Sequence, residues 1–164
     1  MDGRELSIQA TNYRVSRFLK LATGFFADPQ IGGEAHLWSG LLLLLNRQEG
    51  AAAMAQFAAA RNDPDPFVAY LARYSAGRLQ EAAGHPDSSE AAYRDALAVW
   101  PRAQSASLSL ASLLFAAGRP DEAYQLVADA YREPTVMDPF REYGFGQHRR
   151  VGRVMTELRQ ELWR

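Results

Sequence analysis

Residues 77–96 read GRLQEAAGHPDSSEAAYRDA, and residues 111–130 read ASLLFAAGRPDEAYQLVADA. The two stretches lie 34 positions apart and keep small or bulky residues at the same places. The matching pairs are Gly77 and Ala111, Gly84 and Gly118, Ser89 and Ala123, Tyr93 and Val127, and Ala96 and Ala130. A fixed period of this length indicates a repeat architecture in which each unit is a helical hairpin. Because one hairpin cannot bury its apolar face alone, neighbouring hairpins must stack, which favours a binding scaffold.

Apolar residues at three- and four-residue spacing divide most of the chain into helices. Glycine and proline turns separate them and predict three consecutive hairpins. The hairpin helices are predicted over residues 35–46 and 51–61, 67–83 and 88–99, and 103–117 and 121–132. An amphipathic helix is predicted upstream, over 8–27. Downstream, Asp138-Pro139-Phe140 begins a loop or short helical turn, and a helix over 148–164 is expected to cap the stack.

The second and third hairpins resemble the tetratricopeptide repeat family, and the arrangement is similar to that of bacterial repeat proteins. The paired small, glycine and bulky positions follow the family pattern, and Pro101 and Pro134 close the two units. In the first hairpin Gly40 takes the small position and Phe57 the bulky one, but the turn is one residue longer. The resemblance implies a single all-α domain over 1–164 with repeats at 33–69, 70–103 and 104–137. Its fold is expected to be a right-handed α-solenoid of three helical hairpins, with the N-terminal helix at one end and the loop and capping helix of 138–164 at the other.

Composition narrows the class of protein. With 164 residues, 48% hydrophobic and 23% charged, the chain is typical of one soluble globular domain. A formal net charge of -1 leaves no basic footprint for nucleic acid, and the lack of cysteine excludes disulfides and thiol chemistry. The longest apolar run, 41–45, is far shorter than the roughly 20 residues that cross a bilayer. With no signal peptide or transmembrane segment evident, a cytoplasmic location is the default expectation.

Nothing in the sequence indicates catalysis. His36, His85 and His148 fall on three different elements, so they do not share a helical face at metal-ligand spacing. The serines of 105–112 have no base or oxyanion signature beside them. The sequence therefore predicts no catalytic residue, no cofactor, no metal site and no enzymatic activity.

The family resemblance implies that the first helix of each hairpin lines a concave groove. The candidate partner-binding residues on that face are Trp38, Leu41, Leu71, Tyr74, Arg78, Leu108 and Ser112. Family members that grip a terminal carboxylate use several lysines and asparagines, and this set contains neither. Trp38 and Tyr74 beside Arg78 suit a segment with aliphatic or aromatic anchors. The alternative is that Trp38 and Tyr74 pack against the N-terminal helix or against residues 138–147.

Two functions follow from these observations. The first is a non-enzymatic protein-protein interaction scaffold that binds a peptide or protein segment through the concave face of its repeats. The second is a structural self-assembly module that forms homo-oligomers through its terminal helices, with the apolar stripe from Val151 to Leu162 at the interface. The sequence does not specify the partner, beyond excluding nucleic acid and membrane insertion.

Overall fold

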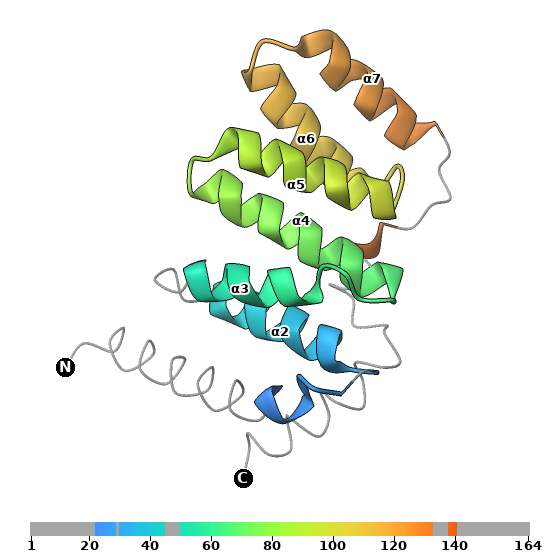
Figure 1. Ribbon diagram of the computed structural model, residues 1–164. Helices are drawn as coiled ribbons and strands as arrows, with labels where there is room; N and C mark the ends of the chain where they lie inside the picture. Colours follow the sequence, from blue (N-terminus) through green and yellow to red (C-terminus); the bar gives the residue numbers. More distant parts are fainter. Residues whose placement is uncertain (1–21, 29, 45–49, 133–137, 141–164) are drawn as a thin grey trace, which may run out of the picture. The chain divides into compact units, whose positions relative to one another are not determined.

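The described part of the chain is helical in the computed structural model, which describes residues 22–28, 30–44, 50–132 and 138–140. One short 3-10 helix, η1, is followed by three hairpins of two α-helices each within these residues (Figure 1). The elements are η1 Thr23–Phe25, α2 Gly32–Leu44, α3 Gly50–Ala60, α4 Pro66–Ala82, α5 Pro86–Val99, α6 Gln104–Ala116 and α7 Pro120–Tyr131. The predicted all-α class and the three consecutive hairpins are confirmed.

The helix ends agree with the sequence prediction to within three residues at each described boundary. Of the predicted helix over 8–27, residues 8–21 lie outside the described residues, and its described end is the 3-10 helix η1. The capping helix over 148–164 and Pro134 also lie outside them. The predicted repeat limits and the single domain over 1–164 remain predictions.

The chain forms two compact units that are described separately. The described residues up to Ala60 belong to the first unit, which contains η1 and the hairpin α2–α3. Residues from Arg61 to Phe140 belong to the second unit, which contains the hairpins α4–α5 and α6–α7. Within the second unit α5 also packs against α6, so these two hairpins stack as the repeat pattern predicts.

In the first unit, the side chain of His36 takes part in packing. Its ring stacks on Phe26 with the centroids 4.0 Å apart. Its Nδ1 is hydrogen-bonded to Oε1 of Gln56 at 2.7 Å, which joins α2 to α3. These contacts use both the ring face and one ring nitrogen in packing the hairpin.

The two hairpins of the second unit turn in the same way. Gly84 and Gly118 each have φ +75°, a left-handed conformation that glycine adopts without steric cost. In each turn the N–H after the glycine donates to the carbonyl five residues earlier, at 3.0 and 2.9 Å, which closes the preceding helix. Pro86 and Pro120 then occupy the first turn of the next helix, where no intrahelical donor is lost. The 34-residue period is therefore a period of backbone geometry.

Small residues lie where the paired helices cross. A Cβ atom added to Gly77 would come within 2.6 Å of the Tyr93 ring, and one added to Gly40 within 2.6 Å of the Phe57 ring. The helices therefore approach so closely that an aromatic ring on one fills the space above a glycine on the other. Ala96 and Ala130 are buried at equivalent positions in the second and third hairpins. This confirms that the repeated small residues face the interior.

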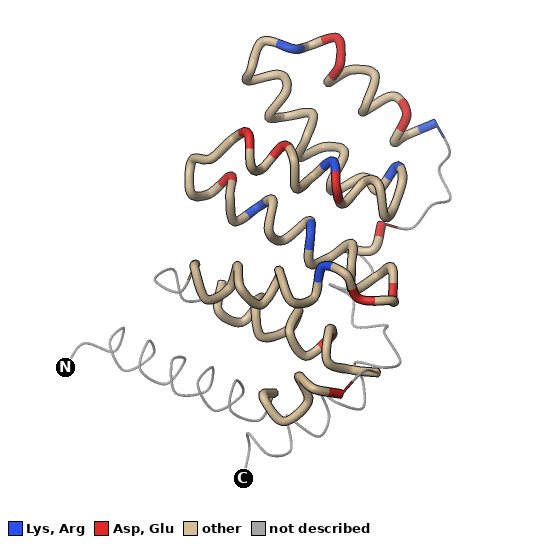
Figure 2. The backbone as a smooth tube through the Cα atoms, viewed as in Figure 1, with Lys and Arg blue, Asp and Glu red and all other residues tan. Residues whose placement is uncertain are grey.

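Charge is distributed unevenly between the hairpins. Figure 2 shows that α2 and α3 are almost free of charged residues, with Glu34 as their single acidic residue. Helices α4 and α5 carry both acidic and basic residues, α7 carries acidic residues, and α6 carries no charged residue (Figure 2). None of the helices in the described part of the chain combines the length and apolar character that crossing a lipid bilayer requires.

Candidate functional site

The predicted partner-binding residues occupy three helices in two units. Trp38 and Leu41 lie on α2 in the first unit, where both are half-buried. The other five lie on α4 and α6 in the second unit, and they are Leu71, Tyr74, Arg78, Leu108 and Ser112. We call the surface formed by Tyr74, Arg78, Ser105, Leu108, Ser109 and Ser112 the first-helix face, because α4 and α6 are the first helices of their hairpins.

The five residues on α4 and α6 differ sharply in exposure. Leu71 is 1% exposed and Tyr74 5%, so both side chains belong to the core of the second unit. Arg78 and Ser112 are exposed, and the side chain of Leu108 between them in the chain is 43% exposed. The first-helix face therefore has a buried part around Tyr74 and an open part around Leu108.

Tyr74 is buried by aromatic side chains from the same unit. Its ring lies 5.9 Å from Tyr70 and 5.7 Å from Tyr93, measured between centroids. Phe140 meets it edge to face at 5.1 Å. This last contact corresponds to the alternative expected from the sequence, in which Tyr74 packs against the segment 138–147. The Tyr74 hydroxyl and Oγ of Ser109 lie 3.4 Å apart, which places α4 beside α6.

Asp138 holds this segment at the start of α6. One carboxylate oxygen accepts a hydrogen bond from the backbone N–H of Ser105 at 2.5 Å, and the other from its hydroxyl at 3.0 Å. The residue before α6 is Ala103, which has no side-chain oxygen to cap the helix. Asp138 therefore supplies, from a distant part of the chain, the acceptor that the first turn of a helix needs.

The carboxylate of Asp138 lies in a largely buried environment. Asp138 is 3% exposed, and Pro139 beside it is also buried. Burial raises the pKa of the Tyr70 hydroxyl, and the negative charge of Asp138 raises it further, which places this carboxylate near the aromatic cluster. A buried carboxylate requires hydrogen-bond donors or positive potential, and the start of α6 offers both.

The role of Asp138 is a feature that sequence reasoning missed. The signal that could have indicated it is a repeated tripeptide, because Asp65-Pro66-Phe67 and Asp138-Pro139-Phe140 have the same residues. In both copies the aspartate accepts a hydrogen bond from the phenylalanine N–H at 2.9 Å. Asp65 is the N-cap of α4, and the chain turns helical after Asp138 as well. The tripeptide is thus a helix start in both places.

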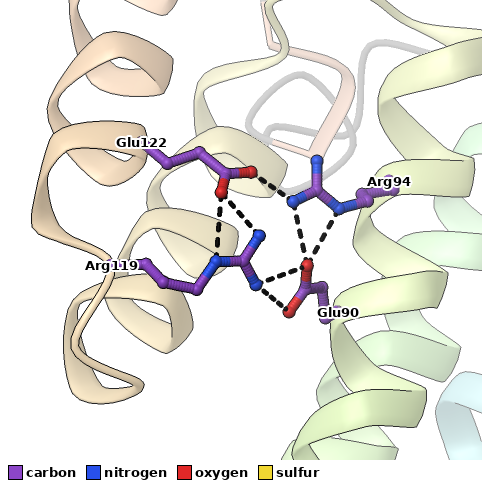
Figure 3. Close-up of polar contacts among 4 residues, drawn as sticks. All are labelled: Glu90, Arg94, Arg119 and Glu122. Carbon is purple, nitrogen blue, oxygen red and sulfur yellow. Dashed lines mark hydrogen bonds and ion pairs between the residues drawn. The ribbon is translucent and has the colours of Figure 1, made fainter.

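A second polar constellation joins α5 to the start of α7. Glu90 and Arg94 come from α5, Glu122 from α7, and Arg119 from the turn before it (Figure 3). Arg119 contacts Glu90 at 3.0 Å and Glu122 at 2.5 Å, and Arg94 contacts Glu90 at 2.9 Å and also pairs with Glu122. Charges of opposite sign therefore alternate around a closed ring of four side chains.

The two acids of this ring have lowered pKa values. Hydrogen bonds from Arg94, and then from Arg119, lower the pKa of Glu90 and of Glu122. All four side chains are substantially exposed, so solvent screening keeps the contribution of each pair small. The ring fixes the register between two hairpins and contains no group suited to proton transfer near neutral pH.

Among the described residues, no three histidine, cysteine, aspartate or glutamate side chains gather closely enough to hold a metal ion. The first-helix face of the second unit has a filled part, where Phe140 covers Tyr74, and an open part, where Leu108 is exposed. That face presents aromatic rings, hydroxyl groups, an arginine and a leucine, which are the groups that recognise peptides.

Comparison with known families agrees with this geometry. The family model of the tetratricopeptide repeat matches residues 74–136. Residues 74–136 are therefore similar to tetratricopeptide repeats. The match runs from α4 through α7 and contains Gly77, Gly84, Gly118 and the alanines of both crossings. Tetratricopeptide repeats generally mediate protein-protein interactions and are typically non-catalytic. A comparison with curated proteins gives no match.

The hairpin α2–α3 lies outside the matched residues, but its helices cross in the same way as those of the second hairpin. Gly40 faces Phe57 as Gly77 faces Tyr93, at the same 2.6 Å from an added Cβ atom. Ala53 and Ala60, the other small positions expected in α3, are both buried. The first hairpin therefore shares with the second a glycine packed against an aromatic ring at the helix crossing.

Proposed function

We propose that this protein is a non-enzymatic interaction module that binds a peptide or protein segment through the first helices of its tetratricopeptide repeats. The observation that supports this most directly is the open part of the first-helix face. Leu108 is 43% exposed there, with Arg78 and Ser112 also exposed. A leucine among polar groups gives a partner an apolar anchor with hydrogen-bonding groups around it.

The chemistry of this face favours a partner with an aliphatic or aromatic anchor and an acceptor for Arg78. A guanidinium group binds carboxylates and backbone carbonyls through several N–H donors. Leu41 and the half-buried Trp38 on α2 extend the proposed set of contact residues in the first unit. Leu71 would contribute through the packing beneath the face, because it is buried.

A capture experiment with matched variants tests the proposal. Tagged protein would be incubated with an extract of the cells that produce it, in parallel with the double variant Arg78→Ala, Leu108→Ala. The matched control is Arg132→Ala, Tyr131→Ala, which removes one exposed arginine and one exposed aromatic side chain at the end of α7, away from the first-helix face. We expect a specific protein to be retained by the wild type and the control and lost by the face variant.

Purified components then give the size of the effect. Removing an anchor at the centre of an interface commonly weakens binding by about tenfold or more. Isothermal titration calorimetry should show that loss for Leu108→Ala and little change for Tyr131→Ala. Equal retention by the face variant and the wild type would contradict the proposal.

Self-assembly is a second candidate, favoured by a different observation. Phe115 and Tyr124 are 60% and 64% exposed, and their rings meet edge to face at 6.5 Å on the hairpin α6–α7. An exposed aromatic pair is a natural contact between copies. Light scattering over a range of concentrations separates the two functions, because self-assembly requires a mass that rises with concentration and falls for Phe115→Ser, Tyr124→Ser.

A further inference from the structure

The filled part of the first-helix face has a specific occupant. Asp138, Pro139 and Phe140 lie against α4 and the start of α6, beyond the end of α7 in the chain (Figure 1). Asp138 contacts Ser105, and Phe140 contacts Tyr74. Three consecutive residues of the chain are therefore held by one helix start and one aromatic ring of the same unit.

The acid and the aromatic ring of the tripeptide each meet a complementary group, and the proline between them is buried. The Asp138 carboxylate receives the backbone N–H and the hydroxyl of Ser105, at 2.5 and 3.0 Å. Its negative charge also lies at the positive end of the α6 dipole. Pro139 is buried, and Phe140 presents its ring to Tyr74 at 5.1 Å. The acid and the aromatic ring thus have separate partners on α6 and α4.

The tripeptide is also locally pre-organised. Its aspartate accepts the Phe140 N–H at 2.9 Å, and the same arrangement recurs at Asp65, Pro66 and Phe67. Because the identical sequence starts a helix at two places, its conformation is set by its own residues and not only by the surface it meets. A segment that is already ordered loses less entropy on binding.

We infer that the first-helix face is a binding site for an acid-proline-aromatic segment at the start of a helix, and that the chain's own Asp138-Pro139-Phe140 occupies it in competition with such a segment from a partner. The inference rests on the proposed interaction function and names the chemistry of the partner. The partner's acid would take the Ser105 donors, and its aromatic ring would take the edge of Tyr74. The open part at Arg78 and Leu108 would contact the residues that flank the tripeptide.

Competition within the chain determines how the site behaves. A segment tethered to its own site acts at an effective concentration in the millimolar range. A free peptide of the same sequence should therefore bind the wild-type protein weakly and bind much better once the tethered copy is weakened. The ratio of the two affinities measures how strongly the tethered segment competes with the free peptide for the site.

A direct test uses a labelled peptide and the full chain. The probe is a fluorescein-labelled, C-terminally amidated peptide with the sequence TVMDPFREY of residues 135–143. Its anisotropy would be titrated with the wild type and with the variant Asp138→Asn, Phe140→Ala. We expect at least tenfold tighter binding to the variant. Binding should be lost when the aspartate and phenylalanine of the peptide are replaced by asparagine and alanine.

Matched variants show that the effect belongs to this site. Asp138→Asn alone should strengthen peptide binding, whereas Asp65→Asn, the same change in the other copy of the tripeptide, should leave it unchanged. Ser105→Ala in the Asp138→Asn, Phe140→Ala background should weaken peptide binding several-fold, because one of the two Ser105 donors is removed. Circular dichroism establishes whether each variant is folded. If the double variant is unfolded, the peptide affinity of the near-isosteric Asp138→Asn variant is compared with that of the wild type instead.

Two outcomes would overturn the inference. In the first, a folded Asp138→Asn variant binds the probe no better than the wild type does. In the second, the probe does not displace a partner whose capture depends on Arg78 and Leu108. The second outcome would leave the proposed function intact. Loss of the proposed function would instead appear as capture that is indifferent to Arg78→Ala, Leu108→Ala, whatever the probe does.

Discussion

Hairpins α4–α5 and α6–α7 share one backbone design but fill their helix crossings differently. In α4–α5 a glycine, Gly77, lies against the large ring of Tyr93, 2.6 Å from where a Cβ atom would be. In α6–α7 the equivalent positions hold Ala111 and Val127, a larger residue opposite a smaller one. The extra methyl group of Ala111 offsets part of the volume that Val127 lacks relative to Tyr93, and Val127 is half-buried where Tyr93 is fully buried. We therefore expect the two positions of each crossing to be energetically coupled.

The same two hairpins differ even more on their surfaces. Tyr74 is buried under Phe140, but Leu108, one period later, is open. Glu90 belongs to the charged ring between α5 and α7, whereas Tyr124, one period later, is exposed beside Phe115. Equivalent positions thus have different surroundings in the two hairpins. The period determines the backbone, and the surroundings determine what each side chain does.

The largest expected effect comes from exchanging the crossing residues of α4–α5 for those of α6–α7. Tyr93→Val alone should lower the free energy of unfolding by roughly 2–4 kcal/mol, because it leaves a cavity in the core. Gly77→Ala alone should cost about 1–2 kcal/mol, because overpacking exceeds the gain in helix propensity. The double variant should cost less than the sum by about 1 kcal/mol, since the added methyl group occupies part of the vacated space. Urea unfolding followed by circular dichroism gives all three values.

The reverse exchange is the control for this cycle. Ala111→Gly should open a void under Val127, and Val127→Tyr should have no room above Ala111, so each single change destabilises. The pair together should recover part of the loss and reproduce the crossing of α4–α5. Strictly additive free energies in both hairpins would contradict the idea that the two positions share one volume.

A smaller effect is expected where the hairpins agree. Gly84→Ala and Gly118→Ala should each cost about 1 kcal/mol, because both glycines have φ +75° and an alanine there is strained. Neither substitution meets another atom within 4 Å, so the cost is that of the backbone alone and should be equal in the two hairpins. Gly24→Ala is the control, since it has the same open space without the left-handed backbone. A difference of more than about 0.5 kcal/mol between the two turns would show that they are not equivalent.

The smallest effect concerns the charged ring, which only one hairpin boundary possesses among the described residues. Because arginine hydrogen bonds lower the pKa of Glu90 and of Glu122, the ring stabilises the fold above the ordinary glutamate pKa of about 4.3. That contribution is lost as pH falls below this value through the folded-state pKa. At pH 7 Glu90→Gln should lower the free energy of unfolding by less than about 1 kcal/mol, and the difference from the wild type should disappear in acid.

Denaturant midpoints measured across the acid range at low and high salt would check this dependence. Asp87→Asn removes an acid from the same helix outside the ring and serves as the control. High salt should reduce the effect of Glu90→Gln, because the pairs are exposed. A Glu90→Gln difference that persists unchanged below pH 4 would mean that packing, and not charge, is responsible.

Local features allowed the fold to be predicted from the sequence. Glycine and proline turns mark the helix ends, and the paired Ala96 and Ala130 mark the buried crossing. The family resemblance, and not spacing alone, indicated Arg78 and Leu108 on the first helices, and both side chains are exposed. The turn signals depend on residues within one or two turns of each other.

The filled part of the first-helix face depends on contacts that local sequence does not contain. Tyr74 is buried because Phe140 returns to it from beyond the last hairpin. Asp138 meets Ser105, 33 residues away, and Arg119 meets Glu90, 29 residues away. Each of these pairs consists of common residue types. Their contact depends on how the hairpins and the segment after α7 pack together. Helical spacing predicts which residues share one face of a helix. It does not predict which distant segment of the chain packs against that face.

The carboxylate at the start of α6 also bears on where this protein can be cut for expression. A recombinant fragment that ends at Arg132 would include α4 to α7 in full and would look complete by its helices. It would nevertheless lose Asp138, and with it the acceptor for the Ser105 N–H. Such a fragment should fray from the beginning of its third repeat, so a useful boundary has to extend past Phe140.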